Sequence, residues 1–130
     1  MDRIRILIAD DHPVVRQGLR TFLSTCPDLE VVGEATNGFT TLDQVRALRP
    51  DVVLLDVRMP GLSGIEAAHR LRRAHPEVKV ILFTTYDDEE YLFGALRVGV
   101  HAYLLKSSSH DTLAAAIRSV HAGEAAASEE

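Results

Sequence analysis

Five polar residues stand at the ends of apolar, strand-like runs along the sequence. They are Asp10, Asp11, Asp56, Thr84 and Lys106. Crowded carboxylates repel one another, and Mg²⁺ is their natural counter-charge, because it binds one or two carboxylates together with phosphate oxygens. A carboxylate that stays free beside the metal can act as a nucleophile and form an aspartyl phosphate. These residues therefore predict a magnesium-dependent phosphoryl-transfer site, if the fold brings them together.

The apolar runs that carry these residues have the length of β-strands. Val, Ile and Leu dominate them, and they mostly do not alternate with polar residues, a pattern typical of strands buried on both faces. The runs cover residues 4–9, 31–35, 52–55, 78–84 and 102–105. Between and after the runs, apolar residues recur at helical spacing, which predicts five amphipathic helices.

The regular alternation of strand and helix patterns predicts an α/β domain, a parallel sheet with helices on both faces. In an open sheet of this kind, ligands bind at the carboxyl ends of the strands, where the five polar residues stand. We expect the domain to span residues 1–123. Residues 124–130 contain only Glu, Ala and Ser and have no apolar stripe. They predict a disordered tail or the start of a linker.

Composition excludes several classes of function. The net charge of −5 disfavours direct binding of nucleic acid, because contacts to phosphates need clustered Lys and Arg. The single cysteine, Cys26, allows no internal disulfide and fits a reducing compartment. No apolar stretch approaches the roughly 20 residues that span a bilayer, so we expect a cytoplasmic protein with no membrane contact. No two of the six histidines stand four positions apart, and no zinc site is expected.

Four motifs occur in an order that resembles a known family. They are Asp10-Asp11, Asp56-Val-Arg-Met-Pro-Gly, Thr84 and Lys106. In this order they resemble the receiver (CheY-like) domains of two-component response regulators, over residues 4–123. The stretch 9–19 is similar to the NarL/FixJ subfamily, whose output is a LuxR-type helix-turn-helix domain. The resemblance implies a flavodoxin-like (βα)5 fold with a five-stranded parallel sheet in the order 2-1-3-4-5.

The resemblance also implies a role for each matching residue. Asp56 is the phosphoacceptor, and Thr84 and Lys106 complete the catalytic set by binding phosphoryl oxygens. The implied Mg²⁺ ligands are Asp10, Asp11, Asp56 and, through its backbone carbonyl, Arg58. Of the first two acids, Asp11 is the expected direct ligand. Thr84 and Tyr103 form the implied switch pair, in which Thr84 moves towards the phosphoryl group and Tyr103 turns into the space that it leaves.

The implied function is two-component signal transduction. A sensor histidine kinase donates the phosphoryl group, and the change of shape controls a DNA-binding output domain that lies outside these 130 residues. A homodimer that forms on phosphorylation is a further expectation. The chain is not expected to be a classical enzyme, since its chemistry is self-phosphorylation and slow autodephosphorylation. Arg58 and Tyr86 are expected to flank the path of the attacking water and slow the second step.

One position departs from the family pattern. The lysine that binds phosphate is usually followed by proline, often through a cis bond, whereas here Ser107 follows Lys106. A cis bond without proline costs about 3–4 kcal/mol. The sequence therefore leaves the isomer of the Lys106–Ser107 bond open.

Other functions are possible for parts of this pattern. A haloacid-dehalogenase phosphatase would need an acid two residues after its nucleophile, where this chain has Arg58. A flavin mononucleotide carrier shares the fold, but acids at positions 10 and 11 would repel its phosphate. The glycine motifs of P-loop and dinucleotide-binding domains are missing. A stand-alone phosphotransfer relay stays open as an alternative within the receiver class.

Overall fold

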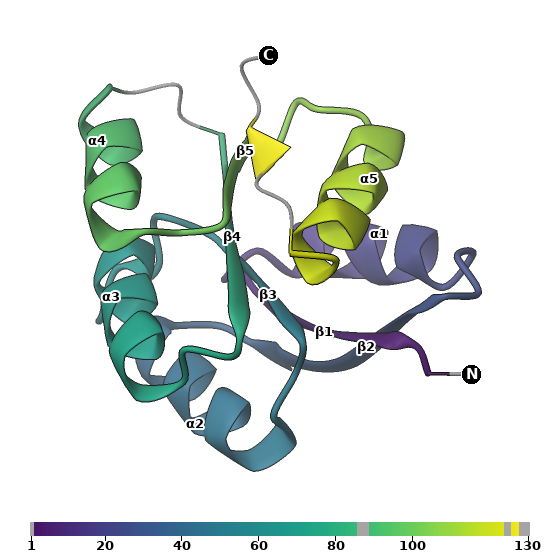
Figure 1. Ribbon diagram of the computed structural model, residues 1–130, viewed down its shortest axis with the longest axis horizontal. Helices are drawn as coiled ribbons and strands as arrows, with labels where there is room; N and C mark the ends of the chain where they lie inside the picture. Colours follow the sequence, from purple (N-terminus) through teal and green to yellow (C-terminus); the bar gives the residue numbers. More distant parts are fainter. Residues whose placement is uncertain (1, 86–88, 124–125, 128–130) are drawn as a thin grey trace.

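The fold is one parallel sheet covered by helices on both faces (Figure 1). The computed structural model describes residues 2–85, 89–123 and 126–127. The strands are β1 (Ile4–Ala9), β2 (Leu29–Ala35), β3 (Val52–Leu55), β4 (Lys79–Thr84), β5 (Ala102–Leu105) and β6 (Ala126–Ala127). Their order is β2-β1-β3-β4-β5-β6, and every neighbouring pair is parallel. The predicted order 2-1-3-4-5 is therefore confirmed for the first five strands.

Five helices connect and cover these strands. They are α1 (Pro13–Leu23), α2 (Gly38–Leu48), α3 (Gly64–Ala74), α4 (Glu89–Val98) and α5 (His110–His121). Helices α1 and α5 lie on one side of the sheet, and α2, α3 and α4 lie on the other (Figure 1). Each crossover from one parallel strand to its neighbour needs such a helix, so the layers follow from the alternation in the sequence.

The sheet separates two hydrophobic cores. Along β1, Ile6 and Ile8 belong to the core under α1 and α5, whereas Leu7 belongs to the core under α2 and α3. All three side chains are fully buried. Successive strand residues point to opposite faces, so a strand covered on both sides must be apolar throughout. This explains why the strand runs in the sequence do not alternate with polar residues.

Two departures concern the ends of the predicted elements. Ala126–Ala127 forms β6 beside β5, within the segment for which no ordered element was expected. Strand pairing at a sheet edge uses backbone groups, so an alanine pair gives no apolar pattern from which it could be predicted. The acidic run 87–90, whose acids suit the start of a helix, lies partly outside the described residues, and α4 begins at Glu89.

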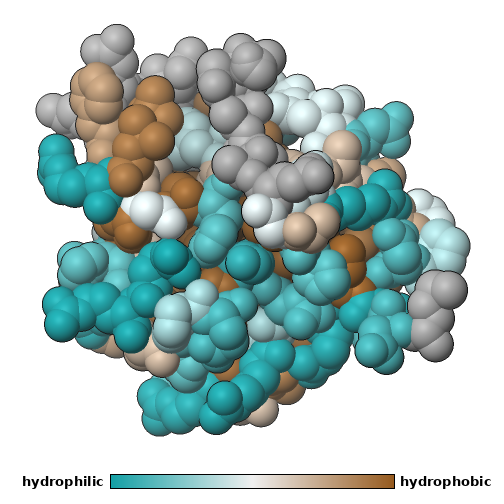
Figure 2. Space-filling model, in the orientation of Figure 1, coloured by the Kyte–Doolittle hydropathy of each residue, from teal (hydrophilic) through white to brown (hydrophobic). Residues whose placement is uncertain are grey.

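The apolar stripe expected on α4 is only partly buried. Ala95 is fully buried, but Leu92, Phe93 and Leu96 are 36%, 54% and 66% exposed. Figure 2 shows this as a group of brown side chains over α4. Among the described helices, none is long and apolar enough to cross a membrane.

Candidate functional site

The acidic residues that follow β1 and β3 lie side by side at the carboxyl edge of the sheet. These two strands are neighbours, and their register pairs Ala9 with Leu55. The backbone N–H of Asp56 donates to the carbonyl of Ala9 at 2.9 Å, which continues the ladder by one residue. The side chains of Asp10 and Asp56 are 3% and 5% exposed. Two carboxylates are therefore held together in a largely buried position, as the sequence predicted.

Lys106 brings the positive charge to this pair. Its ammonium contacts Asp10 Oδ2 directly and lies 3.4 Å from Asp56 Oδ2. The backbone N–H of Lys106 donates to the carbonyl of Thr84 at 2.7 Å, so the ends of β4 and β5 position the lysine together. No peptide bond within the described ranges is cis, and the Lys106–Ser107 bond is trans. With this bond in the trans form, the loop places the Lys106 ammonium beside both Asp10 and Asp56.

Burial has a marked effect on the Asp56 carboxylate. Burial raises its pKa above the ordinary value of 3.8, and Asp10 adds to the rise. Lys106 and a hydrogen bond from the backbone N–H of Arg58 act in the opposite direction. Because the net direction is upwards, the charged form lacks full compensation from the protein. A further cation beside Asp56 would supply that compensation.

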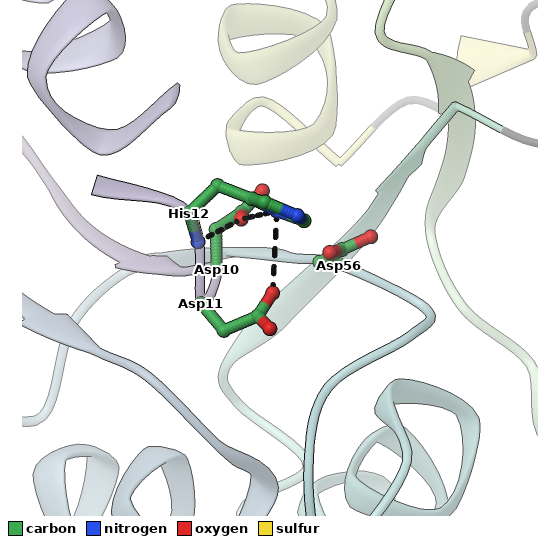
Figure 3. Close-up of side chains that lie close together, drawn as sticks. All are labelled: Asp10, Asp11, His12 and Asp56. Atoms are coloured by element: carbon green, nitrogen blue, oxygen red, sulfur yellow. Dashed lines mark hydrogen bonds and ion pairs between the residues drawn. The ribbon is translucent and has the colours of Figure 1, made fainter. Parts of the chain in front are cut away.

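Asp11 offers a free ligand atom for such a cation. Its Oδ1 atom is buried and accepts no hydrogen bond, although His12 Nδ1 lies 3.2 Å away (Figure 3). A buried oxygen without a hydrogen bond is costly unless another partner binds it. Both oxygens of Asp10, by contrast, already have partners, since Oδ1 accepts from the backbone N–H of His12 at 2.8 Å and Oδ2 contacts Lys106. The oxygen donors present fit Mg²⁺, and Asp11 Oδ1 is the carboxylate oxygen that could bind it without losing a hydrogen bond.

One residue of the cluster was missed by the sequence reasoning. Asp10, Asp11, His12 and Asp56 each offer one ligand atom, and these atoms lie within 4.8 Å of one another. Figure 3 shows the His12 ring over Asp10 and Asp11, with Asp56 beside them. Histidine pairs at zinc spacing were the only histidine signal considered, and His12 has no such partner. Its direct succession to the two acids was the signal that could have identified it.

Arg58 lies at the mouth of the site. It is exposed and lines a hollow of about 530 Å³ together with Asp11, His12, Met59 and Pro60. Its expected neighbour on the path of the attacking water, residue 86, lies outside the described residues. Arg58 thus lies at the solvent-exposed rim of the site, in the same hollow as Asp11 and His12.

The expected switch residues are both buried. Thr84 is fully buried at the end of β4, and Tyr103 on β5 is 9% exposed. Tyr103 belongs to the core on the α2–α4 side, with Leu82 on the neighbouring strand. The structure thus shows Tyr103 in an inward position, which is the position that the switch model gives to the phosphorylated state.

Gly64 is a second residue that the sequence reasoning missed. Its backbone N–H donates to the carbonyl of Val57 at 2.8 Å, and α3 begins at this residue. A Cβ atom at Gly64 would lie 1.9 Å from the carbonyl oxygen of Asp56, much closer than atoms can approach. Only glycine therefore allows the start of α3 to pack against the backbone of Asp56. The glycine three residues after the Met59-Pro60-Gly61 turn was visible in the sequence, but its contact was not.

The comparisons with known proteins agree on one family. The family model described as the response regulator receiver domain matches residues 6–118. This chain belongs to the response regulator receiver family. The match covers nearly all of the domain, including every strand-end residue of the site.

Curated relatives of this receiver domain are longer proteins described as regulators. YxjL of Bacillus subtilis, described as an uncharacterized transcriptional regulatory protein, is 44% identical over 95% of this chain and 57% of its own length. The oxygen regulatory protein NreC of Staphylococcus epidermidis is 43% identical over 93% of this chain and 56% of its own. The chain thus spans little more than half of the relatives that it matches.

Solved structures of the family have the same fold. The receiver domain of the putative response regulator NarL from Mycobacterium tuberculosis superposes with a TM-score of 0.91 at 34% identity, over 95% of this chain and all of that one. A DNA-binding response regulator of the LuxR family from Staphylococcus aureus gives 0.87 at 31% identity, over 91% of this chain and 98% of the other. The chain is therefore a receiver domain of the NarL/LuxR type, a class of two-component transcriptional regulators.

Proposed function

We propose that this receiver domain accepts a phosphoryl group on Asp56 from the phosphohistidine of a sensor kinase, in a reaction that requires Mg²⁺. The observation that carries the proposal is the placement of Lys106 Nζ at 3.4 Å from Asp56 Oδ2, beside the buried acids at the end of β1. A nucleophilic carboxylate, a cation and candidate metal ligands are thereby gathered at one edge of the sheet. The roles of the individual residues are part of this proposal.

The proposed metal ligands are Asp11, Asp56, Asp10 and the backbone carbonyl of Arg58. When bound, Mg²⁺ would neutralise the acids and the equatorial oxygens of the phosphoryl group. The free Oδ1 of Asp11 supports its place as a direct ligand. Asp10 is already shared between His12 and Lys106, so it would act as a direct ligand only after giving up one of these contacts.

Transfer proceeds by attack of an Asp56 carboxylate oxygen on phosphorus. The new O–P bond forms as the N–P bond of the phosphohistidine breaks, and the electron pair of that bond stays on the donor imidazole, which then takes a proton. The Lys106 ammonium and the Thr84 hydroxyl would each bind a phosphoryl oxygen. Because Lys106 also contacts Asp10, it would move from one acid towards the phosphoryl group as the charge of that group arrives.

We propose that Thr84 and Tyr103 transmit the change. The phosphoryl group adds a charge of about −1.5 to −2 and three strong acceptors at Asp56. A Thr84 hydroxyl drawn to these acceptors would leave space beside Tyr103, which favours the inward position of the ring. Phosphorylation would then increase the population of molecules with Tyr103 buried, the position seen here.

The proposed output is transcription. The names of the relatives and the length of the curated proteins support a DNA-binding helix-turn-helix domain that follows residue 123 through the segment 124–130. We also propose a cytoplasmic setting, homodimer formation on phosphorylation, and slow autodephosphorylation with Arg58 beside the water path. A phosphoryl half-life of seconds in the isolated domain would contradict the last of these.

The test is intact-mass analysis after incubation with acetyl phosphate, a small phosphodonor that replaces the kinase. The native chain should gain one adduct of about 80 Da in Mg²⁺ and none in EDTA. Asp56→Asn should gain none in either, whereas Asp43→Asn, an exposed control, should match the native chain. The absence of an adduct on the native chain, or an adduct that persists in Asp56→Asn, would contradict the proposal.

A further inference from the structure

We infer that His12 is a metal ligand of this site and that its imidazole shifts the ion preference from Mg²⁺ towards first-row transition ions such as Mn²⁺. The inference rests on the proposed function, because it concerns the ion that the same acidic cluster would hold. It adds a nitrogen donor to a site that otherwise offers only oxygen. The observations that support it are the distances from the His12 ring to the two acids, and the finding that the ring neither caps α1 nor fills a core.

The distances match those between neighbouring ligands of one ion. His12 Nδ1 lies 2.9 Å from Asp10 Oδ1 and 3.2 Å from Asp11 Oδ1. In an octahedral site with bonds of about 2.1 Å, adjacent ligand atoms lie about 3 Å apart. The same ring nitrogen therefore stands at ligand spacing from two acids at once, and Asp11 Oδ1 is the buried oxygen that accepts no hydrogen bond.

The polar contacts of the ring are with the acids of the site, including a hydrogen bond of 2.9 Å between Nδ1 and Asp10 Oδ1. His12 occupies the position before α1, where a side chain commonly caps the helix, but its ring makes no capping hydrogen bond. Its side chain is 63% exposed, so it does not fill a core either. The backbone N–H of His12 already holds Asp10 Oδ1 at 2.8 Å and does so whatever the side chain is.

The chemistry of the donors decides which ions should benefit. Carboxylate, carbonyl and water oxygens suit Mg²⁺, whereas imidazole suits transition ions and adds little for Mg²⁺. An ion bound by Nδ1 takes the place of the ring's contact with Asp10 Oδ1, and the neutral ring then carries its proton on Nε2. His12 should therefore raise the affinity for Mn²⁺ much more than the affinity for Mg²⁺.

The alternative is that His12 only forms an ion pair with the acids. The distances of 2.9 and 3.2 Å also suit a protonated ring beside two carboxylates. In that case the ring would compete with any cation. Replacement of His12 would then raise the affinity for both ions, or leave their ratio unchanged. The two readings thus predict opposite changes in metal binding for the same substitution.

The experiment compares the native chain, His12→Gln and His69→Gln, an exposed histidine on α3 that serves as the matched control. Isothermal titration gives the affinities for Mn²⁺ and Mg²⁺, and pulsed electron paramagnetic resonance of bound Mn²⁺ detects a nitrogen ligand directly. His12→Gln should lose the nitrogen coupling and lower the Mn²⁺-to-Mg²⁺ affinity ratio about tenfold. His69→Gln should keep both at the native values.

The outcomes separate this inference from the proposed function. If both ions bind the native chain without nitrogen coupling, and His12→Gln leaves the ratio unchanged, the inference is overturned and the proposed magnesium site stands. A higher Mn²⁺ affinity in His12→Gln would likewise overturn it, in favour of the ion pair. If neither ion binds the native chain, the inference fails together with the metal dependence of the proposed function. Unchanged thermal melting of His12→Gln would show that the comparison is between folded proteins.

Discussion

Lys106 Nζ lies 3.4 Å from Asp56 Oδ2, and the same ammonium contacts Asp10 Oδ2. The lysine side chain is only 10% exposed, and its single positive charge is shared between two buried carboxylates. This relationship ties the end of β5 to the ends of β1 and β3. Lys106 is therefore a counter-ion of the buried acids, and in the proposed function its ammonium would also bind a phosphoryl oxygen.

Lys106→Met should therefore destabilise the domain when no divalent ion is present. Loss of the ammonium leaves two buried carboxylates without their cation, and broken pairs of this kind cost about 3 kcal/mol. Urea unfolding in EDTA measures the loss, and excess Mg²⁺ should recover part of it. Lys79→Met, at the other end of β4, should change the free energy of unfolding by less than about 0.5 kcal/mol. Equal stability of the two variants would argue against a counter-ion role for Lys106.

Asp56→Asn should have the opposite effect on stability. Burial raises the pKa of Asp56 in the folded state, so its ionised form opposes folding at all pH values above the ordinary value of 3.8. Removal of the charge should raise the free energy of unfolding at pH 7 in EDTA by about 1 kcal/mol. The exposed control Asp43→Asn should not. A less stable Asp56→Asn variant would show that Lys106 compensates the carboxylate fully.

Gly64→Ala should disrupt the site through the backbone. The new Cβ atom would lie 1.9 Å from the carbonyl oxygen of Asp56, so α3 must move away from this residue. We expect a loss of about 3 kcal/mol in the free energy of unfolding and slower phosphorylation by acetyl phosphate. Gly18→Ala in α1 meets nothing within 4 Å and should stabilise by about 0.5–1 kcal/mol. If both substitutions were tolerated equally, the close approach would not matter.

His101 makes the stability of the domain sensitive to acid, at a position outside the acidic cluster. Its ring Nδ1 accepts the backbone N–H of Val80 at 3.0 Å, and the backbone N–H of His101 donates to the Val80 carbonyl at 2.8 Å. Burial lowers the pKa of His101 below 6.5, and Arg72 and Lys79 lower it further. As the pH falls below 6.5, the unfolded chain therefore binds more protons than the folded chain. The free energy of unfolding should fall as the pH falls.

The variant His101→Asn isolates this effect. Its side-chain oxygen can accept the same N–H from Val80 but does not titrate, so stability should depend less on pH between about 6.5 and 5 than in the native chain. Chemical unfolding at several pH values measures the slope. His69→Gln, on the exposed face of α3, should keep the native slope. If the free energy of unfolding of His101→Asn depended on pH as steeply as that of the native chain, the acid sensitivity would come from other groups.

The sequence pattern was sufficient for the parallel sheet and for the meeting of Asp10, Asp56 and Lys106, whereas the strand order came from the resemblance to the receiver family. Strands buried on both faces leave continuous apolar runs, and parallel strands bring their carboxyl ends to one edge. These two rules need no knowledge of side-chain contacts. They therefore placed the acids and the lysine before any geometry was known.

Other features depend on contacts that the sequence pattern does not encode. The trans Lys106–Ser107 bond, the approach of Gly64 to Asp56 and the ring position of His12 are each set by the path of the backbone in a loop. The β6 pair arises from backbone hydrogen bonding at a sheet edge, with no side-chain signature. Exposed apolar residues on α4 follow the same helical period as buried ones, so periodicity alone could not tell them apart.

The most direct test of the central claim is to identify the residue that carries the phosphoryl group. Borohydride converts an aspartyl phosphate to homoserine, and peptide mass spectrometry then locates the converted residue. After treatment with acetyl phosphate and Mg²⁺, conversion should occur at Asp56 alone and vanish in EDTA. Conversion at Asp10 or Asp11, or a phosphorylated chain with no converted aspartate, would contradict the account.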